Sequence, residues 1–441
     1  MAFSAARMTN AVQPQGRISA MTRRKAYAIT LLAAGAALAS TAALQAKDLT
    51  LLTHAAIQGS ITGASGTGGD VLAGWQQEND VNLNWITADI APLHDRLMRE
   101  TSLSSTSIDV GFILDSYATQ AALSGFEPLD DCLTGLDISD IPQTFLDQVS
   151  QDGQLKALPI RHATTALHYN KALLAEHGID ALPDTFEGLI EVAKTLSGKS
   201  DDGTPVYGLS IDGTNAGGTY NLLMAYGATL TDAQGKPSTD VEALTNAYAA
   251  LADLYAAGAL PSNFTAMGID QITQGVWQGR IAMAVQPFNR YLTYNDASKS
   301  DYAGQVDVAA FPAAEGQPSP YVARTTVWSA VIPANSQNKE LACDFVRQLA
   351  DPENVVLMTL NGNGPVRTDA YLDQRVIDAI PYAQAEQQAV LGAKFVIAPF
   401  DQIGRAQDMY LENMQAAAIG LKTPEQAAAD TLAAIAEAAG N

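Results

Sequence analysis

The sequence predicts an α/β protein whose sheets are largely parallel and covered by helices on both faces. Predicted strands alternate with predicted helices along most of the chain, which is the pattern of a parallel sheet. The chain has 441 residues, and because domains span roughly 100 to 200 residues we expect two lobes behind a leader. Hydrophobic residues make up 47% of the chain, as in ordinary globular proteins with a sizeable core.

Strand and helix pairs are predicted in the first part of the chain. Short apolar or alternating runs indicate the strands, and longer amphipathic runs indicate the helices. The predicted strands are 48–53, 81–86 and 108–114, and the predicted helices are 70–78, 92–103 and 117–123. The segment 59–69, rich in Gly, Ser and Thr, is expected to be a loop that opens the first helix. Its glycines suit an anion, but it lacks the Gly-Lys-Ser/Thr of a nucleotide-binding loop.

A second series of elements begins near Ala157. The predicted helices are 171–177, 185–196, 219–225 and 241–257, and the predicted strands are a run that ends at Gln286, then 306–311 and 326–332. From Tyr382 onward the chain is expected to be helical almost to its end. Thr423 followed by Pro424 marks the start of the last helix, because Pro is favoured at the first helical position.

The N-terminal segment has the features of a secretory signal peptide. Arg23, Arg24 and Lys25 precede an uncharged run rich in Ala and Leu, which matches the charged and apolar regions of such a peptide. We expect residues 1–46 to be this leader, with Met21 as an alternative start and cleavage after Ala46 or Ala43. A membrane anchor is the competing interpretation, but nothing that follows resembles a stop-transfer segment. The prediction is therefore export to the periplasm.

The charge of the chain disfavours nucleic acid and anionic membrane surfaces as partners. The formal net charge is −22, and the expected leader carries five basic residues and no acid. A mature chain would then have 20 basic and 47 acidic residues and a charge of −27. Phosphate groups would be repelled at long range.

Cysteine and histidine give little support for a metal centre. Two cysteines, Cys132 and Cys343, can pair in an oxidising compartment or stay as thiols, and the sequence leaves both states open. The five histidines, at 54, 94, 162, 168 and 177, show no ligand spacing with acids or cysteines. The sequence therefore predicts no zinc site, and we also expect no other metal, no cofactor and no catalytic residue.

Five segments carry a resemblance to a known family. They are Ser107–Asp115 followed by Ser124–Asp130, then Leu158–Ile160 leading through Leu167–Lys171 to Gly178–Glu187, then Gly279–Met283, Val327–Phe345 and Gly420–Ala427. In this order, and covering almost all of residues 48–440, they resemble the family 1 extracellular solute-binding proteins, the group that contains maltose-binding protein. The chain departs from the family at Ile108, where Pro is usual, and at 288–291, which lacks the usual Trp.

The resemblance implies a two-lobe clamshell of the type II-like periplasmic binding proteins. One lobe would comprise 47–160 with 325–370, and the other 161–324 with 371–441. A carbohydrate or polyol would bind between them as a hinge closes, and the protein, a monomer, would deliver it to the membrane permease of an ABC importer. A sugar acid, a sugar phosphate or another small solute is the alternative ligand, and a secreted glycoside hydrolase is the alternative function, although no nucleophile elbow is present.

Candidate ligand-binding residues follow from the rule that ligands lie beyond the carboxyl ends of parallel strands and from the cleft positions that the resemblance implies. Asp115, Ser116 and Tyr117 follow one strand, although Asp115 equally suits a helix cap. Arg161 and His162 lie at the first predicted crossover, where a hinge salt bridge is the alternative. The other candidates are Phe288, Asn289, Arg290 and Tyr291 after a strand, Arg324 and Trp328 at the second crossover, Asn363 and Arg367 in a turn, and Asn215 and Tyr220 near a helix start. Phe288 and Tyr291 equally suit the core.

Overall fold

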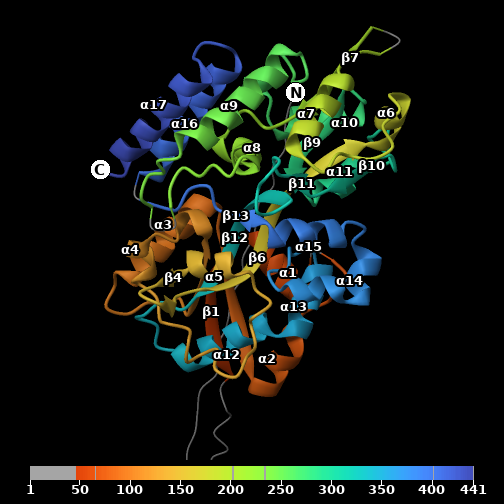
Figure 1. The fold of residues 1–441 in the computed structure, drawn as a ribbon. Coiled ribbons are helices and arrows are strands. Elements are labelled where there is room, and N and C mark those ends of the chain that lie inside the picture. Colours follow the sequence, from red (N-terminus) through yellow and green to blue (C-terminus); the bar gives the residue numbers. More distant parts are fainter. Residues whose placement is uncertain (1–45, 65, 201–202, 233–234, 401, 441) are drawn as a thin grey trace, which may run out of the picture. The chain divides into compact units, whose positions relative to one another are not determined.

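Two long strands, β6 (Leu158–Asn170) and β12 (Tyr321–Val331), run antiparallel through the centre of the sheet. The computed structural model describes residues 46–64, 66–200, 203–232, 235–400 and 402–440. The expected signal peptide lies outside these residues except for Ala46. Figure 1 shows β6 and β12 passing from one group of helices to the other. Both strands therefore belong to two packing environments at once.

The sheet is mixed and not purely parallel. Its order is β2-β1-β3-β12-β6-β9-β8-β7, with β10 on β6 and both β11 and β13 on β12. The strands are β1 (Lys47–Thr53), β2 (Val81–Thr87), β3 (Val110–Leu114), β7 (Gly198–Lys199), β8 (Pro205–Ser210), β9 (Ile281–Pro287), β10 (Val306–Ala309), β11 (Phe311–Pro312) and β13 (Ala393–Lys394). β1 is parallel to β2 and β3, and β8 is parallel to β9, but β6 and β12 run antiparallel to their neighbours β9 and β3. A separate hairpin pairs β4 (Ser150–Gln151) with β5 (Gln154–Leu155).

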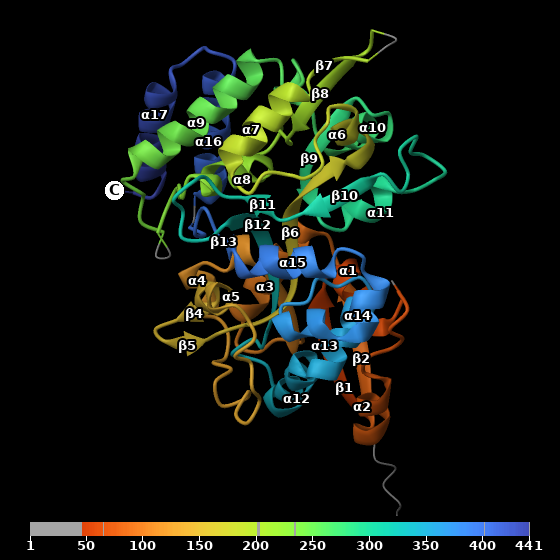
Figure 2. The same cartoon turned by 45° about the vertical axis from the view of Figure 1, so that its right-hand side comes forward.

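The helices fall into two groups. The first group is α1 (Ala55–Thr62), α2 (Ala73–Asn79), α3 (Ile90–Thr101), η1 (Asp115–Tyr117), α4 (Gln120–Leu123), α5 (Gln143–Gln148), α12 (Lys339–Ala350), α13 (Pro352–Leu360), η4 (Thr368–Leu372), α14 (Gln374–Ala379) and α15 (Ala383–Leu391). The second is α6 (Lys171–Glu176), α7 (Phe186–Thr195), η2 (Ala216–Thr219), α8 (Tyr220–Ala225), α9 (Val241–Ala256), η3 (Phe264–Ala266), α10 (Ile269–Trp277), α11 (Arg290–Tyr294), α16 (Ile403–Ala418) and α17 (Pro424–Ala438). Figure 2 shows α9, α16 and α17 side by side, and they pack on one another.

Local sequence explains several helix starts. α17 begins with a capping box in which Thr423 and Gln426 satisfy each other's backbone N–H groups, and Pro424 follows the cap as predicted. The expected loop 59–69 is wrong in its first part, because residues 55–62 form α1. The ring of His54 accepts the N–H of Ala56 at this start, and a histidine cap is a weak signal in a sequence.

Two separate hydrophobic cores divide the described chain. The first includes Leu49, Leu158 and Val331 and continues through Val390. The second includes Leu167, Val322 and Val396. Beyond residue 370, Tyr371, Val376 and Val390 pack in the first core, while Ala389 packs in a smaller cluster with Phe288. Ala393 packs in the first core and Val396 in the second.

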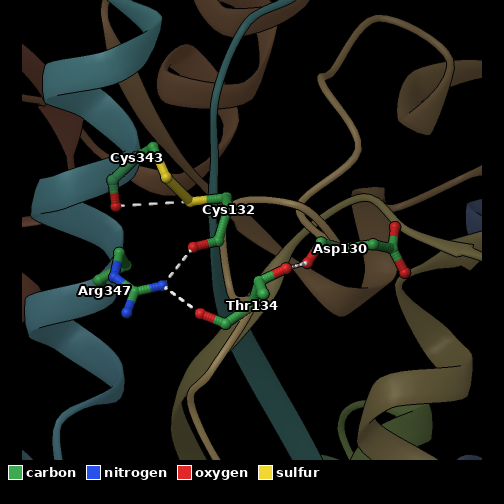
Figure 3. The surroundings of a disulfide bond; sticks show 5 residues. All are labelled: Asp130, Cys132, Thr134, Cys343 and Arg347. Atoms are coloured by element: carbon green, nitrogen blue, oxygen red, sulfur yellow. Dashed lines mark hydrogen bonds between the residues drawn. A yellow bond between two sulfur atoms is a disulfide. The ribbon is translucent and has the colours of Figure 1, made fainter.

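A disulfide joins two distant segments of the first core. Cys132 and Cys343 are bonded, with their Cα atoms 5.6 Å apart and 211 residues between them in sequence. Figure 3 shows the guanidinium of Arg347 beside this bond, donating to the carbonyls of Cys132 and Thr134. The bond resolves the two states that the sequence left open. Among the described helices, none combines the length and apolar character needed to span a membrane.

Candidate ligand-binding site

A polar cavity of about 370 Å³, called cavity A below, lies where the two cores meet β12. From the first core come residues at the end of β3 and in η1, and from the second come η2, α8 and α16. Its polar lining comprises Asp115, Ser116, Thr214, Asn215, Tyr220, Arg324, Thr325, Thr326, Lys394, Gln407 and Asp408. Five residues predicted from the sequence, Asp115, Ser116, Asn215, Tyr220 and Arg324, are brought together here.

The Asp115 carboxylate is buried at the wall of cavity A. Its Oδ1 accepts the N–H of Val327 in the middle of β12 at 2.9 Å, so this oxygen ties the end of β3 to β12 and does not cap a helix. Burial raises the pKa of Asp115 to about 6, and the Val327 hydrogen bond and the Arg324 charge oppose the rise. Ser116 follows it at the cavity surface.

The guanidinium of Arg324 is held inside cavity A. A methyl group on Gly217 would lie 3.0 Å from its Nη2, so the bare backbone of Gly217 gives the guanidinium room. Within the described residues, no ion pair or hydrogen bond joins this guanidinium to another protein group. Arg324 therefore presents free donors to whatever enters the cavity.

Tyr220 and Asn215 also line cavity A, and they differ in their hydrogen bonds within the protein. Tyr220 is only 5% exposed, and its hydroxyl lies near the Gln407 side chain, yet no described group meets it with hydrogen-bond geometry. The Asn215 amide is already engaged, because it donates to Asp212 at 2.7 Å and accepts from the N–H of Gly218 at 2.9 Å. Asn215 thus caps η2 while it lines the cavity.

A second cavity of about 430 Å³, cavity B, contains Arg161, His162, Phe288, Asn289 and Asn363 in its lining. Here the polar groups have protein partners. Arg161 donates to the Asn363 side chain at 3.2 Å, and Asn363 donates to the carbonyl of Ile160 at 2.7 Å. No salt bridge of Arg161 is formed within the described chain, so the alternative of a hinge ion pair is not what the structure shows.

The two cavities flank the same strand pair. Thr326 in cavity A is the register partner of Ala163 in cavity B. Trp328 pairs with Leu114 of cavity A on one side and with Arg161 of cavity B on the other. It lines neither cavity and is packed against the rings of His54 and His94, with centroids 5.9 and 5.5 Å away.

A chain of hydrogen bonds lies behind the strand pair. His162 Nε2 is 2.8 Å from the Tyr371 hydroxyl, and its Nδ1 is 2.9 Å from Thr164 Oγ1, which is 2.9 Å from Thr325 Oγ1. The carboxyl group of Glu386 lies next to the Tyr371 hydroxyl. Burial lowers the pKa of His162 to about 3 and raises the pKa of Glu386 to about 8, so both groups are neutral at pH 7.

Some predicted residues lie outside both cavities. Tyr117 packs on His94 with ring centroids 3.8 Å apart, and Tyr291 packs on Tyr382. Arg290 begins α11 and lines neither cavity. Phe288 lines cavity B, but it is almost completely buried and stacked on Tyr382. This position matches the alternative interpretation of Phe288 as a core residue.

The prediction that Arg367 faces a ligand is not supported by its position. Its guanidinium pairs with Asp140 at 2.8 Å and donates to the carbonyls of Ala350 and Asp137, each at 2.7 Å. All three partners belong to the surroundings of the first core. Because its donors are used within the fold, Arg367 is a structural anchor.

Lys394, Gln407 and Thr326 line cavity A but were not singled out from the sequence. Lys394 lies on the two-residue strand β13, which is too short for a pattern to reveal, and Gln407 lies inside the helical stretch of α16. Among the residues that the structure describes, no group of three or more His, Cys, Asp or Glu side chains could hold a metal ion.

Solved structures of solute-binding proteins share this fold. The GacH receptor of Streptomyces glaucescens, solved unliganded and with acarbose, matches with a TM-score of 0.70 and 20% identity, covering 90% of this chain and 99% of that one. A solute-binding protein of an Agrobacterium radiobacter ABC transporter, solved with ribitol, matches with a TM-score of 0.68 and 19% identity, covering 89% and 99%. The fold is thus the two-lobe α/β fold of the maltose-binding-protein-like transport receptors.

The family follows from the sequence match. A model described as bacterial extracellular solute-binding protein matches residues 58–356, which is more than half of the chain, and the chain belongs to this family. A relative from Deinococcus radiodurans, named as a probable ABC transporter-binding protein, is 24% identical over 261 residues. That match covers 55% of this chain and 61% of the relative, so it spans less than two thirds of the relative's length.

Proposed function

We propose that this protein captures a carbohydrate or polyol in cavity A and delivers it to the membrane permease of an ABC importer. The observation that carries this proposal is the lining of cavity A, which combines side chains of both cores with side chains of the strand that joins them. A ligand in such a position contacts both lobes, so its binding favours the closed arrangement over the open one. Related structures that hold acarbose or ribitol are consistent with a hydroxylated ligand.

The chemistry of the lining suits hydroxyl groups. Carboxylates such as Asp115 accept hydrogen bonds from neighbouring hydroxyls, and the Arg324 guanidinium donates in a fork. The unpartnered hydroxyl of Tyr220 costs free energy until a partner arrives. We propose Asp115, Ser116, Tyr220, Arg324 and Gln407 as the residues that contact the ligand.

The division of the buried residues into two main cores suggests where the lobes and the hinge lie. We propose that β6, β12 and the segment around β13 are the three crossovers, so that the first lobe extends to about Lys394 and does not end at residue 370. A volume of about 370 Å³ suits a small ligand.

We further propose that the mature chain is a periplasmic monomer that leaves its ligand chemically unchanged. The disulfide between Cys132 and Cys343 supports an oxidising compartment. A secreted glycoside hydrolase would instead need two carboxylates facing each other across a scissile bond.

The test is a thermal-shift screen of the chain from Lys47 onward with mono- and disaccharides, polyols, sugar acids, sugar phosphates and polyamines. A ligand at one hundred times its Kd stabilises the folded state by about 2.7 kcal/mol, which is a readily visible shift. The proposal expects a shift with hydroxylated compounds and their recovery intact by chromatography. Shifts with polyamines alone, or cleavage of the sugar, would overturn it.

A further inference from the structure

Two cations that line cavity A occupy paired positions on neighbouring strands, and within the described residues neither forms an ion pair with another protein group. Arg324 on β12 is the register partner of Lys394 on β13, and both line the cavity. Side chains of directly paired residues project to the same face of a sheet with Cβ atoms about 5 Å apart, and like charges in this position destabilise a sheet. Lys394 is exposed and Arg324 is half-buried, so solvent screens part of this repulsion, and an anion bound between them would relieve the rest.

The acids of the same cavity do not neutralise this pair. Asp115 is near enough to feel the charge of Arg324, but no ion pair joins them, and Asp115 Oδ1 is occupied by the N–H of Val327. Asp408 lines the cavity as well. Within the described chain, no ion pair is formed by Arg324, Lys394 or Asp408, although the chain as a whole has a net charge of −22.

The position of Arg324 is fixed by the fold. Its guanidinium packs over Gly217, where a methyl group would be 3.0 Å from Nη2 and 3.2 Å from Cζ. Arg324 and Tyr220 line the same cavity, and the charge of Arg324 acts on the Tyr220 hydroxyl. An unpartnered hydroxyl that is 5% exposed in this cavity is a second, independent sign that a polar ligand completes the site.

We propose that the ligand of cavity A is a sugar acid whose carboxylate lies between Arg324 and Lys394, with its hydroxyl groups toward Asp115 and Tyr220. This assignment rests on the proposed function and narrows its ligand class. The guanidinium fork matches a carboxylate in two parallel hydrogen bonds, and the lysine adds a point charge. A phosphate shares this chemistry, but its second negative charge would meet Asp115 and Asp408 in the same cavity, which favours the monoanion.

Matched pairs of compounds test the assignment by calorimetric titration of the chain from Lys47. The pairs are D-glucuronate with D-glucose, D-galacturonate with D-galactose, and D-gluconate with D-sorbitol, and glucose 6-phosphate is the phosphate arm. We expect at least one acid to bind at least tenfold more tightly than its neutral partner and than the phosphate.

Substitutions then locate the anion. Arg324→Gln and Lys394→Gln should each weaken binding of the acid at least tenfold and reduce its advantage over the neutral partner. Arg324→Lys keeps the positive charge but loses the guanidinium fork. Its affinity for the acid should lie between those of the wild type and Arg324→Gln. Lys299→Gln alters a lysine outside both cavities and serves as the control. Circular dichroism checks that each variant is folded, as we expect because neither cation has a protein partner.

The possible results distinguish the proposed function from the proposal that its ligand is a sugar acid. Neutral compounds that bind as tightly as their acids, or acid binding unaffected by both Gln variants, would overturn the anion assignment and leave carbohydrate capture standing. Tighter binding of glucose 6-phosphate than of the sugar acids would overturn the assignment of a carboxylate as the anionic group. A folded protein that binds no compound of this panel and none of the broader screen would overturn both.

Discussion

The two faces of the β6 and β12 strand pair treat their polar side chains in opposite ways. On one face, His162, Thr164 and Thr325 are joined to Tyr371 in a continuous chain of hydrogen bonds. On the other face, Arg324 projects into cavity A, and no described protein group pairs with its guanidinium. Successive side chains of a strand point to opposite faces, so residues 324 and 325 differ in their partners although both line cavity A.

The difference separates groups that hold the fold from groups that await a ligand. A polar group that is satisfied within the protein stabilises it, and its loss leaves a buried partner unpaired. A polar group that is unsatisfied costs stability in the empty protein and gains a partner on binding. Substitutions on the first face should therefore change the free energy of unfolding, and those on the second should change the ligand affinity.

The largest expected effect on stability is a pH dependence that Glu386→Gln removes. The pKa of Glu386 is raised from 4.5 to about 8, chiefly by burial. Because the folded protein keeps a proton that the unfolded chain releases, wild-type stability falls as the pH rises from about 4.5 to about 8. We expect the variant to gain on the order of 3 kcal/mol relative to wild type between pH 5 and pH 9, measured by urea unfolding.

The difference between the two proteins is the relevant quantity in that experiment. His94, His162 and His168 have lowered pKa values, so they make stability rise with pH below about 6.5 in both proteins. A difference that stays constant across this range would show that Glu386 does not carry a buried proton.

The disulfide should come next in size and should leave binding intact. It links segments 211 residues apart within the first core, and a bond that closes so long a loop restricts the unfolded chain. We expect the double substitution Cys132→Ser with Cys343→Ser to lower the free energy of unfolding by about 2–4 kcal/mol. Ligand affinity at a temperature where the variant is folded should be unchanged. A large loss of affinity would contradict the distinction between groups that stabilise the fold and groups that bind the ligand.

Tyr371→Phe tests the hydrogen-bonded face directly. The substitution removes the hydroxyl shared by His162 and Glu386, and we expect a loss of about 1–3 kcal/mol in stability. Tyr255→Phe is the matched control, because its hydroxyl donates to the Ser262 carbonyl in an exposed position and should matter little. Equal losses of stability in the two variants would argue against a special role for the buried hydrogen bonds around Tyr371.

Gly217→Ala should have the smallest effect on stability and a clear effect on binding. The added methyl group would displace the end of Arg324, a flexible side chain, and not backbone. We expect unfolding to change by no more than about 0.5 kcal/mol and ligand affinity to fall about tenfold. Gly74→Ala places a methyl group in open space and provides the control for both measurements. An unchanged affinity would mean that the guanidinium does not contact the ligand.

Much of the site could be predicted from the sequence because one rule places it. Asp115 and Ser116 follow β3 directly, and the carboxyl end of a parallel strand is where such folds bind ligands. Arg324 was indicated by its place beside the second predicted crossover strand. Arg367 was indicated by a turn that resembles one in the family, but its partner Asp140 is 227 residues away in sequence, and no local pattern reveals such a pairing.

The sequence by itself determined the α/β class, the order of most helices and strands and the resemblance to solute-binding proteins, because periodicity and short motifs are local properties. Only the tertiary structure decided which polar groups remain without a partner. It placed Arg324 opposite Lys394 in neighbouring strands, joined Cys132 to Cys343, and packed Tyr371 and Val390 in the first core. These outcomes depend on contacts between segments far apart in the chain, which burial and register fix only once the whole sheet has formed.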